Sequence, residues 1–366
     1  MFNYLKIPDR RERWLVGSLD LALKPIAGIR RIREIPRQNV PPSRILLLRL
    51  ERIGDMLMTV QAIQSIRRRA PEAHLRLVVG SWNANLAEMV SEVDRVDTVD
   101  APWLSREGTC SSLRDIAQTT LGWSREKFDL GINFEPDIRT NGLLATSGAT
   151  RRVGWTTGGG GAFLTDALHY DSNSHVTLNA QRLVDHALPA ESASSIPAKQ
   201  KPLTLPASAK SFSALHLAEH ARTGPLVGIN PGCGRSIKQW PTERFAQLAA
   251  SVSRLEKATI VLLGAEHERP LTEAIKRSMP AGANVVDMVG TSLIELSGVL
   301  QRISVLVTGD TGPMHLIAAV GCKSVVLYSH QSDPALCGQR GRDVTILHPP
   351  NLASLSTGDV FNVLVG

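Results

Sequence analysis

Short apolar runs alternate along the chain with stretches in which apolar residues recur every three or four positions. From residue 44 onward, the runs at 44–50, 74–79 and 128–133 have the length of strands, and residues 56–69 have the helical pattern. Continuous apolar runs are typical of parallel strands that are buried on both faces. Because strands alternate with helices, this part of the chain predicts a parallel sheet covered by helices, an α/β fold.

A second α/β series follows. It predicts strands at 226–230, 259–263, 305–308 and 324–328, and helices at 242–255, 271–278 and 313–320. Between the two series, residues 189–211 are rich in Pro, Ser, Ala and Lys, which predicts a linker with an irregular edge. We therefore expect an N-terminal domain over residues 44–205 and a C-terminal domain over residues 206–366. The glycine run 158–161 predicts a flexible loop, with a mobile lid over a site as the functional alternative.

Residues 1–43 form an extension that precedes the first predicted strand. Within it, apolar residues recur at spacings of four and three, which places them on one stripe of a helix. The stripe consists of Leu15, Leu19, Ala22, Ile26 and Ile29. Pro25 interrupts the pattern, and we expect it to kink or split the helix.

The charge of the chain is concentrated in this extension. Across 366 residues, 41 Lys and Arg outnumber 34 Asp and Glu, for a net charge of +7 and a pI near 9.5. Residues 1–44 hold ten basic and four acidic residues, so they account for +6 and leave +1 for the rest. That distribution disfavours a fold that grips nucleic acid along its length. An apolar stripe flanked by arginines fits an anionic membrane surface, and the alternatives are a helix packed on the body or a solvated arm.

Other compositional features narrow the class of protein. A hydrophobic content of 43% and a mean hydropathy of −0.04 are typical of a folded soluble protein. The four cysteines are scattered without zinc-ligand spacing, which predicts free thiols in a reducing compartment and no metal site. No run of 18 apolar residues and no clear signal peptide are present. We expect a cytoplasmic protein without a cofactor.

Asp55 is the first candidate for chemistry. It follows the first predicted strand within the sequence LERIGDM, where the chain passes into a helix. In open α/β sheets, ligands bind outside the carboxyl ends of the strands. Asp55 could therefore act as a general base in that crevice, and the alternative is a structural helix N-cap.

The sequence GINPGCGRSIKQWP, residues 228–241, follows another predicted strand. Its glycines would let the backbone approach an anion closely, and Lys238 would supply a positive charge for a phosphate. The spacing of a Walker A loop is absent. The alternative is a glycine-rich connection that carries a solvated lysine.

The sequence VTGDTGPMHL, residues 307–316, gives the sharpest signal. Its proline suits the first turn of a helix, which leaves the backbone N–H groups of Thr311 and Gly312 free for an anion at the positive helix end. Asp310 beside that site suits sugar hydroxyls better than phosphate oxygens. His315, one turn further, is either a site residue or a packed structural histidine.

Glu266 follows a further predicted strand in LLGAEH. A carboxylate there could accept two hydrogen bonds from a ribose diol, and the alternative is an exposed loop acid. No GxGxxG follows the first strand of either series, which disfavours a dinucleotide fold. No GxSxG, HExxH or protein-kinase motif is present.

Together these segments resemble glycosyltransferase family 9, the bacterial lipopolysaccharide heptosyltransferases. The resemblance spans most of residues 44–330 in family order. The matching stretches are ILLLRLERIGDMLMTVQAIQSIRRRAPEAHLRLVVG, RRVGWTTGGGGAFLT, VGINPGCGRSIKQWPTERFAQLA, VLLGAEHE and VTGDTGPMHLIAAVG.

The resemblance implies a GT-B fold, in which two Rossmann-like domains, acceptor-binding and nucleotide-sugar-binding, face each other across a cleft. It also implies inverting transfer of a heptose, typically from ADP-heptose, to a lipopolysaccharide core or other glycolipid acceptor. Asp55 falls on the catalytic base of the family. The donor-binding residues that it implies are Lys238 for phosphate, Glu266 for ribose, and Asp310, Thr311, Gly312, His315, Asn230 and Gly232 around them. Without a DxD motif, we expect metal-independent catalysis.

Two features depart from the family pattern. Residues 328–334 read YSHQSDP where the family commonly has a Gly-Pro-Thr-like turn near the donor, so a different nucleotide sugar and glycan acceptor are an alternative. The extension over residues 1–43 is also longer than the usual start, and it suggests a peripheral place at the inner face of the bacterial inner membrane. A non-catalytic GT-B binding protein is a further alternative, which the intact Asp55, Lys238 and Asp310 disfavour.

Overall fold

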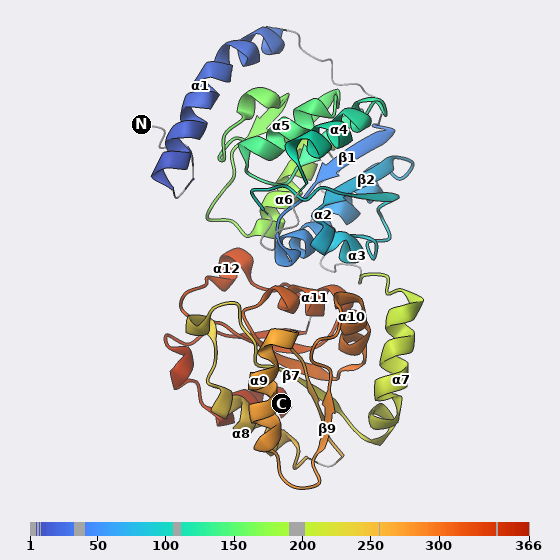
Figure 1. Ribbon diagram of the computed structural model, residues 1–366, viewed down its shortest axis with the longest axis vertical. Coiled ribbons are helices and arrows are strands. Elements are labelled where there is room, and N and C mark those ends of the chain that lie inside the picture. Colours follow the sequence, from blue (N-terminus) through green and yellow to red (C-terminus); the bar gives the residue numbers. More distant parts are fainter. Residues whose placement is uncertain are drawn as a thin grey trace. The chain divides into compact units, whose positions relative to one another are not determined.

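The computed structural model describes residues 5, 7, 9–32, 41–104, 111–189, 202–255, 257–341 and 343–365. The chain divides into two compact units, Met1–Ala198 and Lys199–Gly366 (Figure 1). The described residues of each unit contain one six-stranded parallel sheet.

The sheet of the first unit has the strand order β3-β2-β1-β4-β5-β6. Its strands are β1 (Arg44–Leu48), β2 (His74–Val79), β3 (Arg95–Thr98), β4 (Leu130–Asn133), β5 (Arg151–Trp155) and β6 (Asp166–Leu168). The order reverses between β1 and β4, which pair in parallel with Leu48 opposite Asn133. Ligand sites of such sheets form at this reversal, outside the carboxyl ends of the two strands.

Helices cover both faces of this sheet. The helices of the first unit are α1 (Arg10–Ile32), α2 (Ile53–Arg69), α3 (Ala84–Ala87), α4 (Leu113–Ser124), α5 (Ile138–Thr146) and α6 (Val176–Ala187), with short 3-10 turns η1 (Ser81–Asn83) and η2 (Gly161–Phe163). Helices α2 and α6 pack together, as do α4 and α5. Figure 1 shows the first pair and the second on opposite sides of the sheet.

The sheet of the second unit repeats this plan with the order β12-β11-β10-β7-β8-β9. Its strands are β7 (Leu226–Asn230), β8 (Thr259–Leu262), β9 (Asn284–Asp287), β10 (Val305–Gly309), β11 (Ser324–Leu327) and β12 (Val344–Leu347). The order reverses between β7 and β10, and Thr308 lies opposite Asn230 across that pair. The predicted α/β series is therefore confirmed in both units.

The helices of the second unit are α7 (Ala207–Thr223), α8 (Thr242–Val252), α9 (Arg269–Arg277), α10 (Leu293–Arg302), α11 (Gly312–Val320), α12 (Pro334–Cys337) and α13 (Thr357–Val365), with η3 (Ser236–Lys238), η4 (Glu266–Glu268) and η5 (Leu352–Ser354). Helix α7 packs on α10, and α13 packs on α8. The linker prediction for residues 189–211 is wrong at its end, because α7 already begins at Ala207. Residues 190–201 lie outside the described residues.

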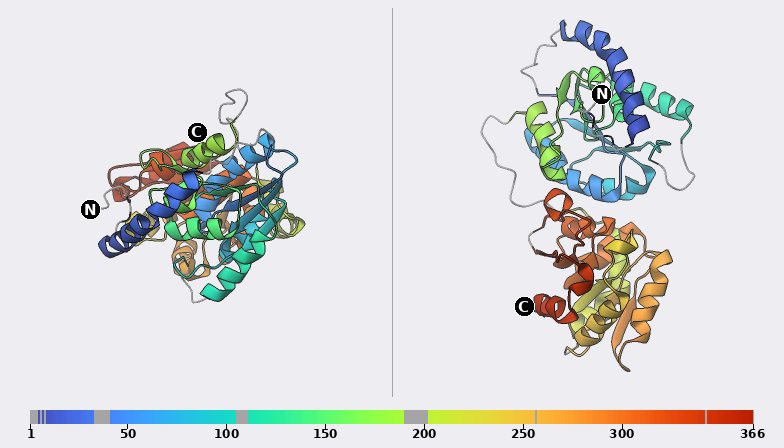
Figure 2. Two further views of the ribbon diagram at one scale, coloured as in Figure 1. Left: turned by 90° about the horizontal axis from the view of Figure 1, so that it is seen from above. Right: turned by 90° about the vertical axis from the view of Figure 1, so that its left-hand side faces the viewer.

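Helix α1 belongs to the first unit and packs on η2 (Figure 2). It starts at Arg10 because the Asp9 side chain accepts a hydrogen bond from Glu12 N at 2.8 Å. Pro25 does not split it, since the helix runs through that position to Ile32. The side chains of Ile26 and Ile29, part of the predicted stripe, lie outside the described structure.

Candidate active site

Asp55 lies in the first turn of α2, a few residues after the end of β1. The helix begins at Ile53 with Arg52 as its N-cap, so Asp55 is the third helical residue and the N-cap alternative is wrong. Its side chain is 29% exposed. It lines a cavity of about 280 Å³ together with Arg49, Glu51 and the apolar side chains of Phe134, Pro136, Trp155 and Val176.

Arg49 holds two carboxylates at this cavity. Its side chain is 4% exposed, with Nη1 2.9 Å from Glu51 Oε2 and Nη2 3.3 Å from Asp55 Oδ1. Nη1 also donates a hydrogen bond to the Phe134 carbonyl oxygen, 3.0 Å away. Because Phe134 follows β4 and Arg49 follows β1, the reversal of strand order brings these groups together. Arg49 thereby fixes the position of the Asp55 carboxylate.

Glu135 is a buried carboxyl group beneath this ion-pair cluster. Its Oε1 accepts hydrogen bonds from the backbone N–H groups of Leu50 and Glu51, the latter at 2.8 Å. Burial and repulsion from Glu51 raise the pKa of Glu135 to about 8. Burial likewise raises the pKa of Glu51. Glu135 therefore holds its proton to a higher pH than an exposed glutamate does, and its hydrogen bonds fix the turn that leads to Asp55.

The raised pKa of Glu135 makes the stability of the protein depend on pH. Glu135 binds its proton more tightly in the folded chain than in the unfolded chain, where its pKa is the ordinary 4.5. The free energy of unfolding therefore falls as the pH rises from about 4.5 through about 8. Glu135→Gln keeps an acceptor oxygen and never ionises. We expect the free energy of unfolding of this variant, relative to wild type, to rise between about pH 5 and pH 8 in urea denaturation. Parallel pH profiles for the two proteins would contradict this.

The predicted donor-binding residues lie in the second unit, at the carboxyl ends of its central strands. Lys238, in η3 after β7, places Nζ 2.6 Å from Oδ2 of Asp310, which follows β10. Asn230, at the end of β7, donates from Nδ2 to Thr308 Oγ1 at 3.2 Å. Lys238 is therefore paired with a carboxylate and 21% exposed, so the alternative of a solvated lysine is wrong.

Two polar atoms in this cluster are buried without a hydrogen-bond partner in the described part of the chain. They are Asn230 Oδ1 and Thr311 Oγ1. Leaving such a group unpaired costs about 1–3 kcal/mol, so buried polar atoms are almost always satisfied. Thr311 is the N-cap of α11, and the space around the Gly312 Cα would accept an additional atom without a clash. Thr311 Oγ1 can donate a hydrogen bond to an anion at the start of α11, and Asn230 Oδ1 can accept one from a ligand hydroxyl.

Glu266 lies in η4 after β8, and its side chain is 69% exposed. Its carboxylate pairs with Arg269, whose Nε lies 2.6 Å from Oε1, and that hydrogen bond lowers the pKa of Glu266. Glu268, which we did not predict, lies beside the loop that follows Asn230. A Cβ atom at Gly232 would clash with the Glu268 carboxylate, so the glycine leaves room for that group.

The turn over residues 328–334 reaches the same cluster. Ser332 Oγ donates a hydrogen bond to Asp310 Oδ2, the oxygen that also pairs with Lys238. The sequence singled out this turn as a departure, but it did not predict the Ser332 contact. His315, in α11, is only 9% exposed.

Among the residues that the structure describes, no group of three or more His, Cys, Asp or Glu residues is arranged to hold a metal ion. No helix in the described ranges has the length and apolar character needed to cross a membrane.

Comparison with known proteins identifies the family to which the chain belongs. The family model of glycosyltransferase family 9 (heptosyltransferase) matches residues 122–356. Lipooligosaccharide heptosyltransferase 2 of Haemophilus influenzae is 25% identical over 300 residues, which cover 79% of this chain and 84% of that protein.

Solved structures share the fold. Glycosyltransferase family 9 from Veillonella parvula has a TM-score of 0.78 at 21% identity and covers 88% of this chain and 96% of its own. The ADP-heptose lipopolysaccharide heptosyltransferase II of Escherichia coli has a TM-score of 0.75 at 18% identity and covers 88% and 97%. The fold is that of the GT-B heptosyltransferases, with two Rossmann-like units. The chain belongs to glycosyltransferase family 9, the heptosyltransferases.

Proposed function

We propose that this enzyme transfers a heptose from ADP-heptose to a lipopolysaccharide core or a related glycolipid. Relatives across most of the chain are named for heptose transfer, and the E. coli structure is named for ADP-heptose. The observation that carries the proposal is the cluster at the carboxyl ends of β7 and β10. There Lys238, the N-terminus of α11 and the unpartnered Thr311 hydroxyl suit a diphosphate, and the unpartnered Asn230 Oδ1 suits a sugar hydroxyl.

In the proposed reaction, Asp55 acts as the general base. Its carboxylate accepts the proton of an acceptor hydroxyl while that oxygen attacks the anomeric carbon of the heptose. The bond from the anomeric carbon to the diphosphate oxygen breaks, and the electron pair leaves with ADP. Attack from the side opposite the leaving group inverts the anomeric centre. The cavity beside Asp55 receives the acceptor.

Lys238 and the backbone N–H groups at Thr311 and Gly312 stabilise the charge that develops on the departing diphosphate. Charge stabilisation by these groups makes the reaction independent of a divalent metal. Lys238 exchanges its contact with Asp310 for a phosphate oxygen, and Asp310 then accepts hydrogen bonds from sugar hydroxyls. Glu266 binds the ribose diol, and Asn230, Gly232 and His315 complete the donor site.

A thermal-shift panel tests the donor assignment. We expect ADP and ADP-heptose to raise the melting temperature of the wild-type protein more than GDP- or UDP-sugars at equal concentration, because a ligand stabilises the state that it binds. If only a GDP- or UDP-sugar raised the melting temperature, that nucleotide sugar would be the donor in place of ADP-heptose. A non-catalytic binding protein would show the shift without any turnover.

We further propose that the enzyme works in the cytoplasm, at an anionic membrane surface that α1 contacts. The outward face of α1 carries Trp14, Leu15, Leu19 and Leu21, which are 61, 71, 49 and 42% exposed. Of the two acidic residues of α1, Asp20 accepts a hydrogen bond from Gly160, and Glu12, whose side chain is 45% exposed, pairs with Arg139. An outward face with four exposed apolar side chains, and with its nearest acidic group paired to an arginine, suits an interfacial helix.

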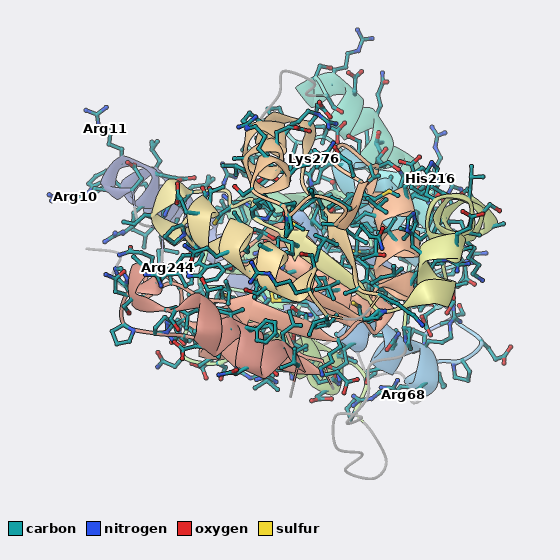
Figure 3. The ribbon with its side chains drawn as sticks, turned by 90° about the horizontal axis from the view of Figure 1, so that it is seen from below. Arg10, Arg11, Arg68, His216, Arg244 and Lys276 are labelled. Atoms are coloured by element: carbon teal, nitrogen blue, oxygen red, sulfur yellow. The ribbon has the colours of Figure 1, made fainter. Side chains whose placement is uncertain are left out.

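Charge reversal at the start of α1 should weaken this contact. Arg10 and Arg11 are exposed, and Figure 3 shows both side chains extending outward from the end of α1. Each basic residue near an anionic surface contributes about 1 kcal/mol. We therefore expect Arg10→Glu with Arg11→Glu to lower binding to phosphatidylglycerol-containing vesicles at least about thirtyfold, in a sedimentation assay. The matched control, Lys276→Glu in α9, should bind like wild type, and equal binding by both variants would contradict the proposal.

A further inference from the structure

The glycine run 158–161 is held in place rather than mobile. Gly158, Gly159 and Gly160 are buried, and Asn141 Nδ2 donates to the Gly159 carbonyl oxygen at 2.9 Å. Gly159 and Gly160 have φ angles of +87° and +74°, which favour glycine. The predicted flexible loop is therefore wrong, and these glycines serve a close contact.

That contact is with the N-terminal extension. A Cβ atom at Gly159 would lie 2.5 Å from Val16 Cγ1 of α1. The Gly160 N–H donates to Asp20 Oδ1 at 2.7 Å, and Glu12 Oε1 lies 3.4 Å from Arg139 Nη2 in α5. An apolar contact, a hydrogen bond and an ion pair thus join α1 to the loop and to α5. The missing side chain at position 159 is what allows α1 to lie this close.

The segment before α1 continues this packing up to the Asp55 cavity. Leu5 is 2% exposed and packs with Val16 and Ile138. Arg13 Nε donates to the Ile7 carbonyl oxygen at 2.7 Å, which ties this segment back to the helix. Ile7 itself lines the cavity that contains Asp55 and Gly158. One wall of the cavity is therefore built by the extension.

We propose that the N-terminal extension forms part of the acceptor site. Ile7 provides an apolar wall of that site, and α1, which packs on the glycine run, holds Ile7 in position. The inference rests on the proposed function, in which this cavity receives the acceptor. Charged Arg49, Glu51 and Asp55 supply the polar side of the cavity, and Ile7 joins Phe134 and Pro136 on the apolar side. This pairing fits a sugar that turns a hydroxyl toward Asp55 and its C–H face toward Ile7.

The test separates acceptor binding from the other steps. Ile7→Ala removes the wall, and we expect the KM for the acceptor to rise roughly tenfold, the effect typical of lost apolar contact in a specificity site. The kcat and the thermal shift with ADP should stay as in wild type, because the donor-binding residues lie in the other unit. Leu215→Ala in α7 is the matched control, since Leu215 is 83% exposed and lies in the other unit, and its acceptor KM should not change.

A second pair of variants tests the contact between α1 and the glycine run. Asp20→Ala removes the acceptor for the Gly160 N–H and should raise the acceptor KM, whereas Asp20→Asn keeps an acceptor oxygen and should restore it. An unchanged acceptor KM in both Ile7→Ala and Asp20→Ala, with transfer intact, would overturn the inference and leave the proposed function standing. Absence of heptose transfer by the wild-type enzyme would instead overturn the proposed function itself.

Discussion

Asp55→Asn should lower kcat for heptose transfer about 10²- to 10⁴-fold, the usual contribution of a general base. The amide has nearly the same shape as the carboxylate, so Arg49 loses one of its charged partners and keeps Glu51, 2.9 Å away. The thermal shift with ADP should not change, because Asp55 and the donor-binding residues lie in different units. Steady-state kinetics with saturating donor and acceptor would measure the effect.

The matched comparison for this variant is Glu51→Gln. Glu51 also pairs with Arg49 and lines the same cavity, so the two substitutions differ in which carboxylate they remove. We expect the larger loss of kcat in Asp55→Asn. A larger loss in Glu51→Gln would assign the base to Glu51 and contradict the proposed role of Asp55.

Lys238→Ala should lower kcat about 10²- to 10³-fold, the typical cost of removing one group that stabilises charge in a transition state. Without Lys238, the Asp310 carboxylate, 10% exposed, loses its cation at 2.6 Å and keeps only the Ser332 hydroxyl among its described side-chain partners. The anionic leaving group would then meet an uncompensated negative charge. The affinity for ADP, measured by titration calorimetry, should fall with kcat.

The control for this variant is Lys276→Ala in α9. The Lys276 side chain is 48% exposed, and its one ion pair among the described residues is a long surface contact with Glu273, 3.8 Å away. Its loss should therefore leave kcat and ADP binding unchanged. Lys238→Arg retains the charge and should recover part of the lost rate. Full activity in Lys238→Ala would remove this residue from the stabilisation of the diphosphate.

The sequence predicted the inner strands of both sheets except β5, which begins with two half-buried arginines and was not expected. The strands expected at 74–79 and 226–230 have those bounds in the structure, because fully buried parallel strands read as continuous apolar runs. The outer strands β3, β6, β9 and β12 were not predicted. Each has only three or four residues, exposed or half-buried, so they lack the continuous apolar run of a central strand.

For the candidate site, the sequence indicated side chains that follow strands, and Lys238 and Asp310 do meet at the reversal between β7 and β10. It did not predict the partners that depend on strand order. Glu135 reaches the Asp55 turn only because β4 lies beside β1, and no local pattern encodes that neighbour. The sequence does contain a signal for the role of Arg49 that we did not use. A charged residue at the end of the apolar run ILLLR needs a buried partner.

The contact between α1 and the glycine run could not be predicted either. A run of four glycines is typical of flexible loops, and only the position of Val16 against Gly159 reveals a packing reason for it. The apolar stripe was correctly assigned to a helix, but Leu15 and Leu19 of that stripe face outward while Val16 faces the body. Helical spacing alone does not decide which apolar face a protein buries.

Direct measurement of heptose transfer tests the central claim. Wild-type enzyme, ADP-heptose and a lipopolysaccharide-core acceptor are incubated, and ADP release and the mass of the acceptor are followed together. We expect ADP and the heptosylated acceptor to form in equal amounts, with the rate lost in Asp55→Asn and retained in Lys276→Ala. ADP-heptose that stays intact with this acceptor, while a GDP- or UDP-sugar is consumed, would contradict the account.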